Sequence, residues 1–189
     1  MRAAAIEAAT EIFGSVGYRA ATFKDVAAKL DMTSAGLSYY FPDKDSLLAA
    51  VLQERDSRAS DAETAIPASP SRDDLIEYVM GVLAENIAHA GLAELHCVVS
   101  AEATSCDHPA HEYFRNRYRA GRRLLSDAFE AAAAHGEIRS SLPPRMLATL
   151  LLSVLDGVQL QWLLDADEVD MQDTVRSFLS DLLAPPKPE

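Results

Sequence analysis

The sequence predicts an all-α protein, and three observations lead to this fold class. Alanine, leucine, glutamate and arginine are abundant, and these residues have high helix propensity. The 189 residues include only 8 glycines and 9 prolines, so helix-breaking positions are sparse. No run alternates apolar and polar residues as a half-buried strand requires. We therefore expect about nine helices.

Glycine and capping residues place the first two helices. Apolar residues recur at three-and-four spacing over residues 2–16, which predicts an amphipathic helix that Gly17 ends. A second helix is expected over 23–30. Thr22 stands at its N-cap and Asp25 follows three residues later, which is the pattern of a capping box.

The third and fourth helices follow closely. The third is expected over 34–40, because Thr33 can cap it and Pro42 stops it. A longer fourth helix begins near Lys44, with Asp43 as its cap. The apolar side chains of these elements can form a small core, for which we expect Ile6, Phe13, Val16, Phe23, Val26, Ala27, Leu30 and Leu37.

A linker that contains Pro67 and Pro70 separates this unit from the rest of the chain. Five further helices are expected over residues 72–90, 92–105, 109–136, 144–166 and 170–183. We expect two domains, 1–48 and 49–189, with the helix that starts near residue 44 linking them.

Composition excludes several classes of protein. A chain of this length can bury about 70% of its unfolded surface, so a core without disulfide staples is expected. Two cysteines, Cys97 and Cys106, cannot form a disulfide framework, which favours a reducing compartment. The most apolar run, 146–155, is half of the ~20 residues that cross a bilayer, and Glu7 interrupts the apolar start. We expect a cytoplasmic protein with no membrane partner.

Charge is distributed unevenly along the chain. The formal net charge is −12, yet residues 1–55 carry a net charge of only −1. The N-terminal third therefore repels an anionic partner much less than the rest does, which is a weak indication of nucleic-acid binding.

The second and third predicted helices are joined by three residues, 31–33, which is the spacing of a helix-turn-helix. With the apolar residues turned to the core, Ser34, Ala35, Ser38 and Tyr39 lie on the outward side of the third helix. A helix of roughly 10–12 Å could lie in a major groove that is ~12 Å wide.

The residues over about 6–52 resemble the TetR family of transcriptional regulators. The segments GYRAATFKDVA from Gly17 and MTSAGLSYYFPDKDSL from Met32 carry a glycine–tyrosine pair, a threonine cap, paired aromatics and Phe-x-x-Lys-x-x-Leu in register. The resemblance implies a homodimeric, ligand-responsive repressor, not an enzyme, in which residues 1–48 bind an operator and 49–189 bind a ligand and dimerise.

Carried over by position, the resemblance assigns Ser34, Ala35 and Ser38 to base edges. It assigns five residues to phosphates: Thr22, Thr33, Tyr39, Tyr40 and Lys44. Hydroxyl groups and a lysine ammonium suit phosphate oxygens. The chain departs from the family at Asp31, where a left-handed glycine is usual, and at Gly36 and Ser38, which leave few groups to read bases.

The helix expected over 144–166 is apolar nearly all round, so it must be covered on more than one side. By resemblance, this helix and the last one pair with their two-fold mates. The expected interface residues are Leu151, Leu155, Val158, Trp162, Val175, Phe178 and Leu182. A larger core within one chain is the alternative.

Polar residues on apolar helix faces indicate a ligand pocket. The candidate residues are Asn86, His96, Val99, Glu102, Phe114, Arg117, Tyr118, Asp156 and Gln159. Each polar member alone is more often a satisfied core group. Together they predict a largely apolar cavity for a small effector, with no cofactor.

Cysteine and histidine residues raise the question of a metal, with His108 and His111 near Cys106. No second tight ligand pair accompanies them, so we expect no metal site, although metal binding by these three residues stays open. The sequence predicts a DNA-binding regulator that acts as a repressor on a near-palindromic operator. The alternative is a helical small-molecule sensor that no longer reads DNA; an enzyme using His96, Glu102 or Asp156 has little support.

Overall fold

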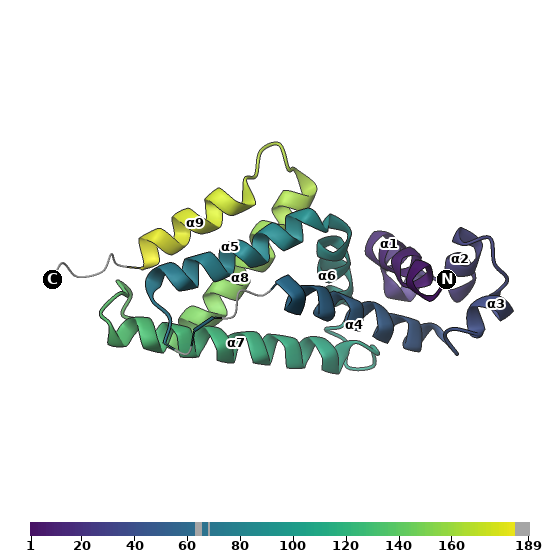
Figure 1. The fold of residues 1–189 in the computed structure, drawn as a ribbon, viewed down its shortest axis with the longest axis horizontal. Helices are drawn as coiled ribbons and strands as arrows, with labels where there is room; N and C mark the ends of the chain where they lie inside the picture. The colour runs from purple at the N-terminus through teal and green to yellow at the C-terminus, as the bar shows by residue number, and fades with distance from the viewer. Residues whose placement is uncertain (63–65, 68, 184–189) are drawn as a thin grey trace. The chain divides into compact units, whose positions relative to one another are not determined.

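A computed structural model describes residues 1–62, 66–67 and 69–183. Over these residues the chain forms nine helices. These residues contain no strand, and the only β-type pairing among them is an isolated antiparallel bridge between Ile138 and Leu183. The helices are α1 (Arg2–Ala20), α2 (Phe23–Lys29), α3 (Ser34–Ser38), α4 (Lys44–Ala62), α5 (Arg72–Ala88), α6 (Ala90–Glu102), α7 (His111–Ala134), α8 (Pro144–Leu164) and α9 (Met171–Leu182) (Figure 1). The predicted all-α class is confirmed.

The chain divides into two compact units. The first contains residues 1–61 and 89–115, and the second contains 62–88 and 116–189. Helix α6 thus packs with the N-terminal helices, against α1, although 49–189 was expected to be a separate domain. The division into a DNA-binding domain, 1–48, and a ligand-binding domain, 49–189, stays a prediction.

Helix α1 breaks where the sequence predicts. Gly17 has φ 83° and ψ 161°, a conformation that is essentially restricted to glycine, and residues 18–20 resume helical geometry. Gly17 is buried four residues after Phe13, whereas Val16 is 55% exposed. The expectation that Val16 joins the core is therefore wrong, because residue 17 takes the inward position of this turn.

Local hydrogen bonds confirm the predicted caps. Thr22 and Asp25 form a reciprocal capping box at the start of α2, and the Thr33 hydroxyl accepts from the Gly36 N–H at 3.1 Å. Asp31 lies in the left-handed region at φ 54°. Helix α3 ends at Ser38, two residues earlier than expected, since the backbone tightens ahead of Pro42.

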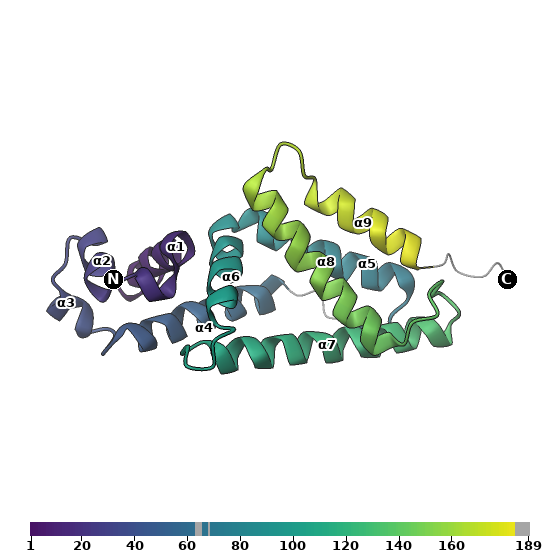
Figure 2. The same ribbon diagram turned by 180° about the vertical axis from the view of Figure 1, so that it is seen from behind.

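The second unit buries its core between α5, α7, α8 and α9. Figures 1 and 2 show α9 beside α5 and α8, and residues of these helices are in contact. Leu151, Val175 and Leu179 have no exposed surface. The Glu137 carboxylate accepts from the Arg72 N–H at 2.9 Å and so satisfies a free amide at the start of α5.

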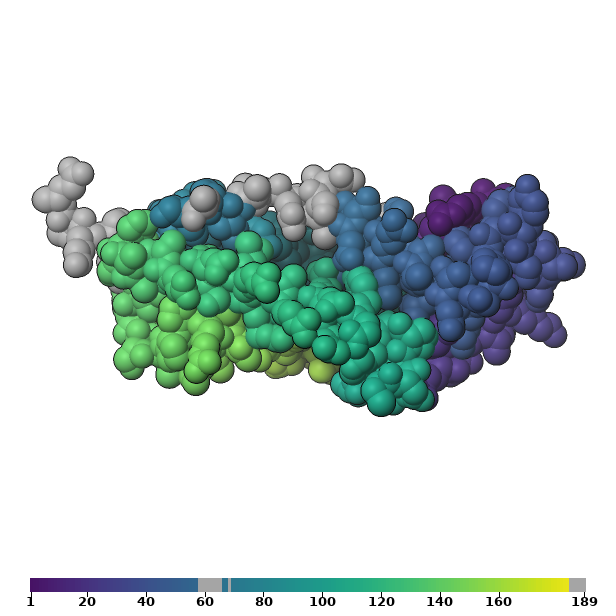
Figure 3. All heavy atoms as spheres, turned by 90° about the horizontal axis from the view of Figure 1, so that it is seen from below, coloured from purple at the N-terminus to yellow at the C-terminus, as the bar shows by residue number. Residues whose placement is uncertain are grey.

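Helix α7, coloured from teal to green in Figure 3, carries exposed charged side chains. Its exposed arginines include Arg115, Arg119, Arg122 and Arg123. Arg115 pairs with Glu112 at 2.7 Å, and Arg119 donates to the Asn116 amide oxygen at 3.3 Å. The local pairing is that of a solvated helix face.

Helix α8 has 21 residues, and an 18-residue stretch of it has a mean hydropathy of 1.5, so its length and composition alone would allow it to cross a membrane. Core helices of soluble proteins pass the same test. Exposed apolar side chains follow one stripe of this helix, at Met146, Leu150, Leu160 and Leu164.

Candidate nucleic-acid interface and interior polar sites

Helix α3 presents the outward face that its sequence predicts. Ser34, Ala35 and Ser38 are exposed, while Leu37 is fully buried and anchors the helix to the core. The Ser38 hydroxyl donates its hydrogen to the Ser34 carbonyl oxygen at 2.9 Å. The hydroxyl oxygen can therefore still accept a hydrogen bond from a partner outside the protein. The face is small and polar, and it carries no charged side chain.

Aromatic side chains extend this face beyond the end of α3. Tyr39 is 86% exposed and packs edge-to-face on Tyr40, with ring centroids 5.2 Å apart. An exposed tyrosine carries an apolar ring and a hydroxyl donor, which is a combination suited to a phosphate and sugar backbone.

Two of the predicted phosphate contacts have other partners in this structure. The Thr22 hydroxyl donates to the Asp25 carboxylate at 2.7 Å, so it would have to turn before it could donate to a phosphate. The Lys44 ammonium donates to the carbonyl oxygens of Tyr18 and Ala21 at 2.9 and 2.8 Å and lies 4.1 Å from the centroid of the Tyr18 ring. Lys44 therefore ties the end of α1 to the start of α4.

The predicted ligand residues fall in both units. His96, Val99, Glu102 and Phe114 belong to the first unit, where the His96 ring packs on Phe114 at 5.5 Å and Val99 is fully buried. The prediction of one common pocket stays a prediction.

Two polar pairs lie inside the second unit. The Asn86 side-chain amide donates to Gln159 at 2.7 Å, which links α5 to α8. The Tyr118 hydroxyl donates to Asp156 at 2.7 Å, which links α7 to α8. Asp156 and Gln159 are three residues apart and share one face of α8. Arg117, which precedes Tyr118 on α7, is half-buried. The second unit thus carries a partly buried polar band that links α8 to α5 and to α7.

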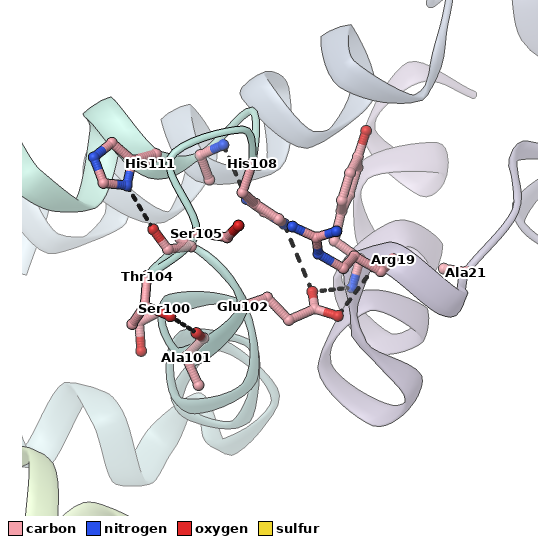
Figure 4. Close-up of polar contacts among 12 residues, drawn as sticks. Arg19, Ala21, Ser100, Ala101, Glu102, Thr104, Ser105, His108 and His111 are labelled. Carbon is pink, nitrogen blue, oxygen red and sulfur yellow. Dashed lines mark hydrogen bonds and ion pairs between the residues drawn. The ribbon is translucent and has the colours of Figure 1, made fainter.

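Glu102 has partners on α1 in this structure, and its role in ligand binding stays a prediction. Its carboxylate accepts from the backbone N–H groups of Tyr18 and Arg19, at 2.7 and 3.2 Å, directly after the break at Gly17 (Figure 4). A Cβ atom added at Gly17 would lie 2.5 Å from a Glu102 carboxylate oxygen. Only glycine allows this close approach.

Histidine and aspartate side chains surround the same carboxylate. His108 is buried, and its Nε2 lies 3.7 Å from Glu102 Oε2. Its Nδ1 accepts from the Ala110 N–H at 3.1 Å, and its ring packs on Tyr18 at 5.0 Å. Arg19 pairs with Asp107 at 3.0 Å on the exposed rim. We call Glu102, His108 and the α1 residues 17–19 the α1–α6 junction.

The pKa values of the junction follow from burial and hydrogen bonding. Burial lowers the pKa of His108, against the attraction of Glu102. A hydrogen bond from Ser105, followed by the Arg19 charge, lowers the pKa of Asp107. Burial and a hydrogen bond to Asp45 raise the pKa of the Tyr18 hydroxyl.

The two histidines of this region, His108 and His111, each face a different group of the protein. His111 Nδ1 faces the Ala103 carbonyl oxygen at 2.8 Å, and His108 is turned to Glu102. Among the residues that the structure describes, no three metal-ligating side chains converge.

Helix α4 carries one further feature that the sequence did not indicate, a groove of about 270 Å³ beside the start of α7. Leu48 and Leu52 form its floor, and Asp45 and Asp56 flank them. The Tyr113 hydroxyl donates to Asp56 at 2.7 Å, so the Asp56 carboxylate already has a hydrogen-bond partner within the protein.

The predicted dimer residues separate into two groups. Leu151 and Val175 are fully buried in the chain's own core, which corrects their assignment to an interface. Leu155, Trp162, Phe178 and Leu182 are half-buried and keep exposed surface, whereas Val158 is 8% exposed.

A capped helix-turn-helix with an outward α3 defines a DNA-binding type of protein. Comparison with known proteins gives the family. Residues 5–51 match the model of bacterial regulatory proteins of the tetR family, and residues 72–184 match the C-terminal model of BetI-type transcriptional repressors. The chain belongs to the TetR family of transcriptional regulators, with a C-terminal region of the BetI type.

Individual relatives are distant. The A-factor receptor protein of Streptomyces griseus is 20% identical over 178 residues, which cover 94% of this chain but only 60% of that relative. Salmonella enterica GusR has a TM-score of 0.69 at 26% identity, with 96% of this chain and 94% of that chain covered. A regulator of Saccharomonospora viridis solved in complex with choline has a TM-score of 0.72 at 20% identity, covering 97% and 98%. The last of these supports the fold alone.

Proposed function

We propose that this protein is a homodimeric transcriptional repressor that binds a near-palindromic operator and is released from it by a small effector. The observation that carries the proposal is the outward face of α3, where Ser34, Ala35 and Ser38 are exposed on a helix that capping and a buried leucine hold in place. Chromosomal DNA as its target implies a cytoplasmic location, and regulation by binding needs no catalytic step.

A second copy of the chain is the partner that suits α8. Met146, Leu150, Leu160 and Leu164 are between 43% and 79% exposed, and they follow three-and-four spacing through Ser153 and Gly157. An apolar stripe of this length on a soluble protein calls for a cover. We place the dimer contact on this stripe, together with Leu155, Trp162, Phe178 and Leu182.

The effector is proposed to bind in the second unit. The partly buried Asn86–Gln159 and Tyr118–Asp156 pairs offer donors and acceptors in a unit whose core is apolar, so a ligand with an apolar body and a few polar groups would find partners there. The Saccharomonospora viridis regulator, which was solved with choline, shows that a protein of this fold can hold a small molecule.

Effector and DNA must prefer different conformations of the protein for release to occur. The coupling free energy in such systems is typically about 1–3 kcal/mol. An effector that bound the free protein and the DNA complex equally well would release nothing, and would contradict this part of the proposal.

A gel shift tests DNA binding. The probe is the duplex upstream of the protein's own coding region, at about 50 and 200 mM salt. We expect sequence-selective retardation that weakens with salt. Ser38→Ala should change the preference among duplexes, while Tyr39→Phe, which removes one phosphate donor, should weaken binding to all of them alike. Ligand binding without any retardation would instead indicate a sensor protein that no longer reads DNA.

A further inference from the structure

We propose that Glu102 of α6 is a positioning residue for DNA reading: it holds the backbone of Tyr18 and Arg19 and thereby orients the segment that leads into the helix-turn-helix. This inference rests on the proposed DNA-binding function. It assigns a role to a carboxylate that lies outside α2 and α3 and touches neither bases nor phosphates itself.

The first step is the geometry at Gly17. A positive φ interrupts α1, so the N–H groups that follow the break lose their regular helical partners. Glu102 Oε2 accepts from Tyr18 N–H at 2.7 Å and Oε1 accepts from Arg19 N–H at 3.2 Å. One carboxylate therefore fixes two successive peptide groups, and bonds to an ionised acceptor are the stronger kind.

The second step is what this backbone carries. Tyr18 also donates its hydroxyl to Asp45, and Lys44 donates to the carbonyl oxygens of Tyr18 and Ala21. Thr22, the N-cap of α2, follows directly. The segment from 17 to 22 is thus held by α6 on one side and by the first turn of α4 on the other, and it sets the direction in which α2 starts.

The third step is the proton that the junction can take up. His108 Nε2 lies 3.7 Å from Glu102 Oε2, the oxygen that accepts from Tyr18 N–H. The charged groups that act on His108 are Glu102 from α6, Arg19 from α1 and Asp107 from its own loop. The Tyr18 ring of α1 packs on His108, and its hydroxyl donates to Asp45 of α4. Because His108 Nδ1 accepts from the Ala110 N–H, the neutral ring carries its hydrogen on Nε2, and a further proton would go to Nδ1. That proton would displace the Ala110 N–H and place a buried positive charge beside Glu102, which would draw the carboxylate toward the ring and loosen its hold on α1.

Amide exchange measures the hold directly. We compare wild type with Glu102→Ala and Glu102→Gln. The matched control is Glu94→Gln, an exposed glutamate of the same helix whose carboxylate lies near Gly14, in the regular part of α1 ahead of the break. In Glu102→Ala the Tyr18 and Arg19 amides should exchange about tenfold faster, the factor that one lost bond to a charged group predicts. Glu102→Gln keeps one carbonyl oxygen and should recover part of the protection.

DNA binding tests the consequence. With the duplex that wild type selects from a random library as probe, Glu102→Ala should bind about tenfold more weakly, Glu102→Gln should be intermediate, and Glu94→Gln should match wild type. Faster amide exchange with unchanged affinity would overturn the positioning role. Unchanged exchange would overturn it as well, whether or not DNA binds. A wild type that selects no duplex would refute the proposed function, while the exchange measurement still decides whether Glu102 holds α1.

The pH profile separates positioning from a merely structural role. His108→Asn keeps an acceptor for the Ala110 N–H but cannot be protonated. Between pH 7.5 and about 5.5, wild type should lose affinity for the selected duplex more steeply than His108→Asn does. The exposed His135→Asn should follow wild type. Identical profiles for wild type and His108→Asn would overturn the part assigned to His108.

Discussion

Gly17→Ala should destabilise the protein far more than an ordinary glycine substitution does. Alanine at φ 83° and ψ 161° costs about 1–3 kcal/mol in backbone strain. The new Cβ would also meet Glu102 Oε1 at 2.5 Å, so the carboxylate must shift, and losing one of its two bonds to α1 adds about 1.5–3 kcal/mol. The sum, about 2.5–6 kcal/mol, is a large share of a typical stability of about 5–15 kcal/mol.

Urea unfolding at a fixed protomer concentration measures this loss. Gly81→Ala in α5 is the control, because a Cβ there meets nothing within 4 Å and alanine should gain about 0.5–1 kcal/mol in helix propensity. Glu102→Ala removes the clash, so the double variant should lose about 1.5–3 kcal/mol less than the sum of the two single losses. A Gly17→Ala protein within 1 kcal/mol of wild type would refute the reasoning.

Three further outcomes follow from local contacts. Thr22→Ala removes the cap of α2 and should cost about 1 kcal/mol in urea unfolding, whereas Thr10→Ala within α1 should cost almost nothing; equal losses would contradict the capping argument. The hydrogen bond from the Thr22 side chain lowers the pKa of Asp25, so its share of stability is present above pH 3.8 and is lost as pH falls below that value; an NMR midpoint at or above 3.8 would contradict this. Tyr118→Phe leaves Asp156 without that donor and should cost about 1–2 kcal/mol, a loss that calorimetry should detect.

Capping was predictable because its partners are neighbours in the sequence. Thr22 and Asp25 are three residues apart, and so are Thr33 and Gly36, and short-range chemistry fixes both caps. The left-handed turn at Asp31 is local in the same sense. The length of α3 was less predictable, because its end depends on how the backbone tightens before Pro42.

The junction was not predictable, because Glu102 and Tyr18 are 84 residues apart. A glutamate on an apolar stripe gives the same sequence signal whether it faces a ligand or caps another helix. Only the packing of α6 on α1 distinguishes the two roles.

The faces of α8 show a further limit of sequence reasoning. An all-apolar helix predicts that two sides are covered, but it does not say which residue faces which side. Leu150 and Leu151 differ by one position, about 100° of rotation, and the first is 43% exposed while the second is fully buried. The family resemblance indicated a dimer helix, and the structure separates its exposed stripe from its core stripe.

Selection of duplexes from a random library by wild-type protein tests the central claim most directly. The account predicts a near-palindromic consensus whose half-sites lie about 10 base pairs apart or a multiple of that, recognised by a protein of twice the monomer mass. It also predicts that Ser34→Ala combined with Ser38→Ala alters this consensus while the fold is retained. A monomeric protein, or sequencing reads that show no enriched motif, would contradict the assignment of α3 as a DNA-reading helix.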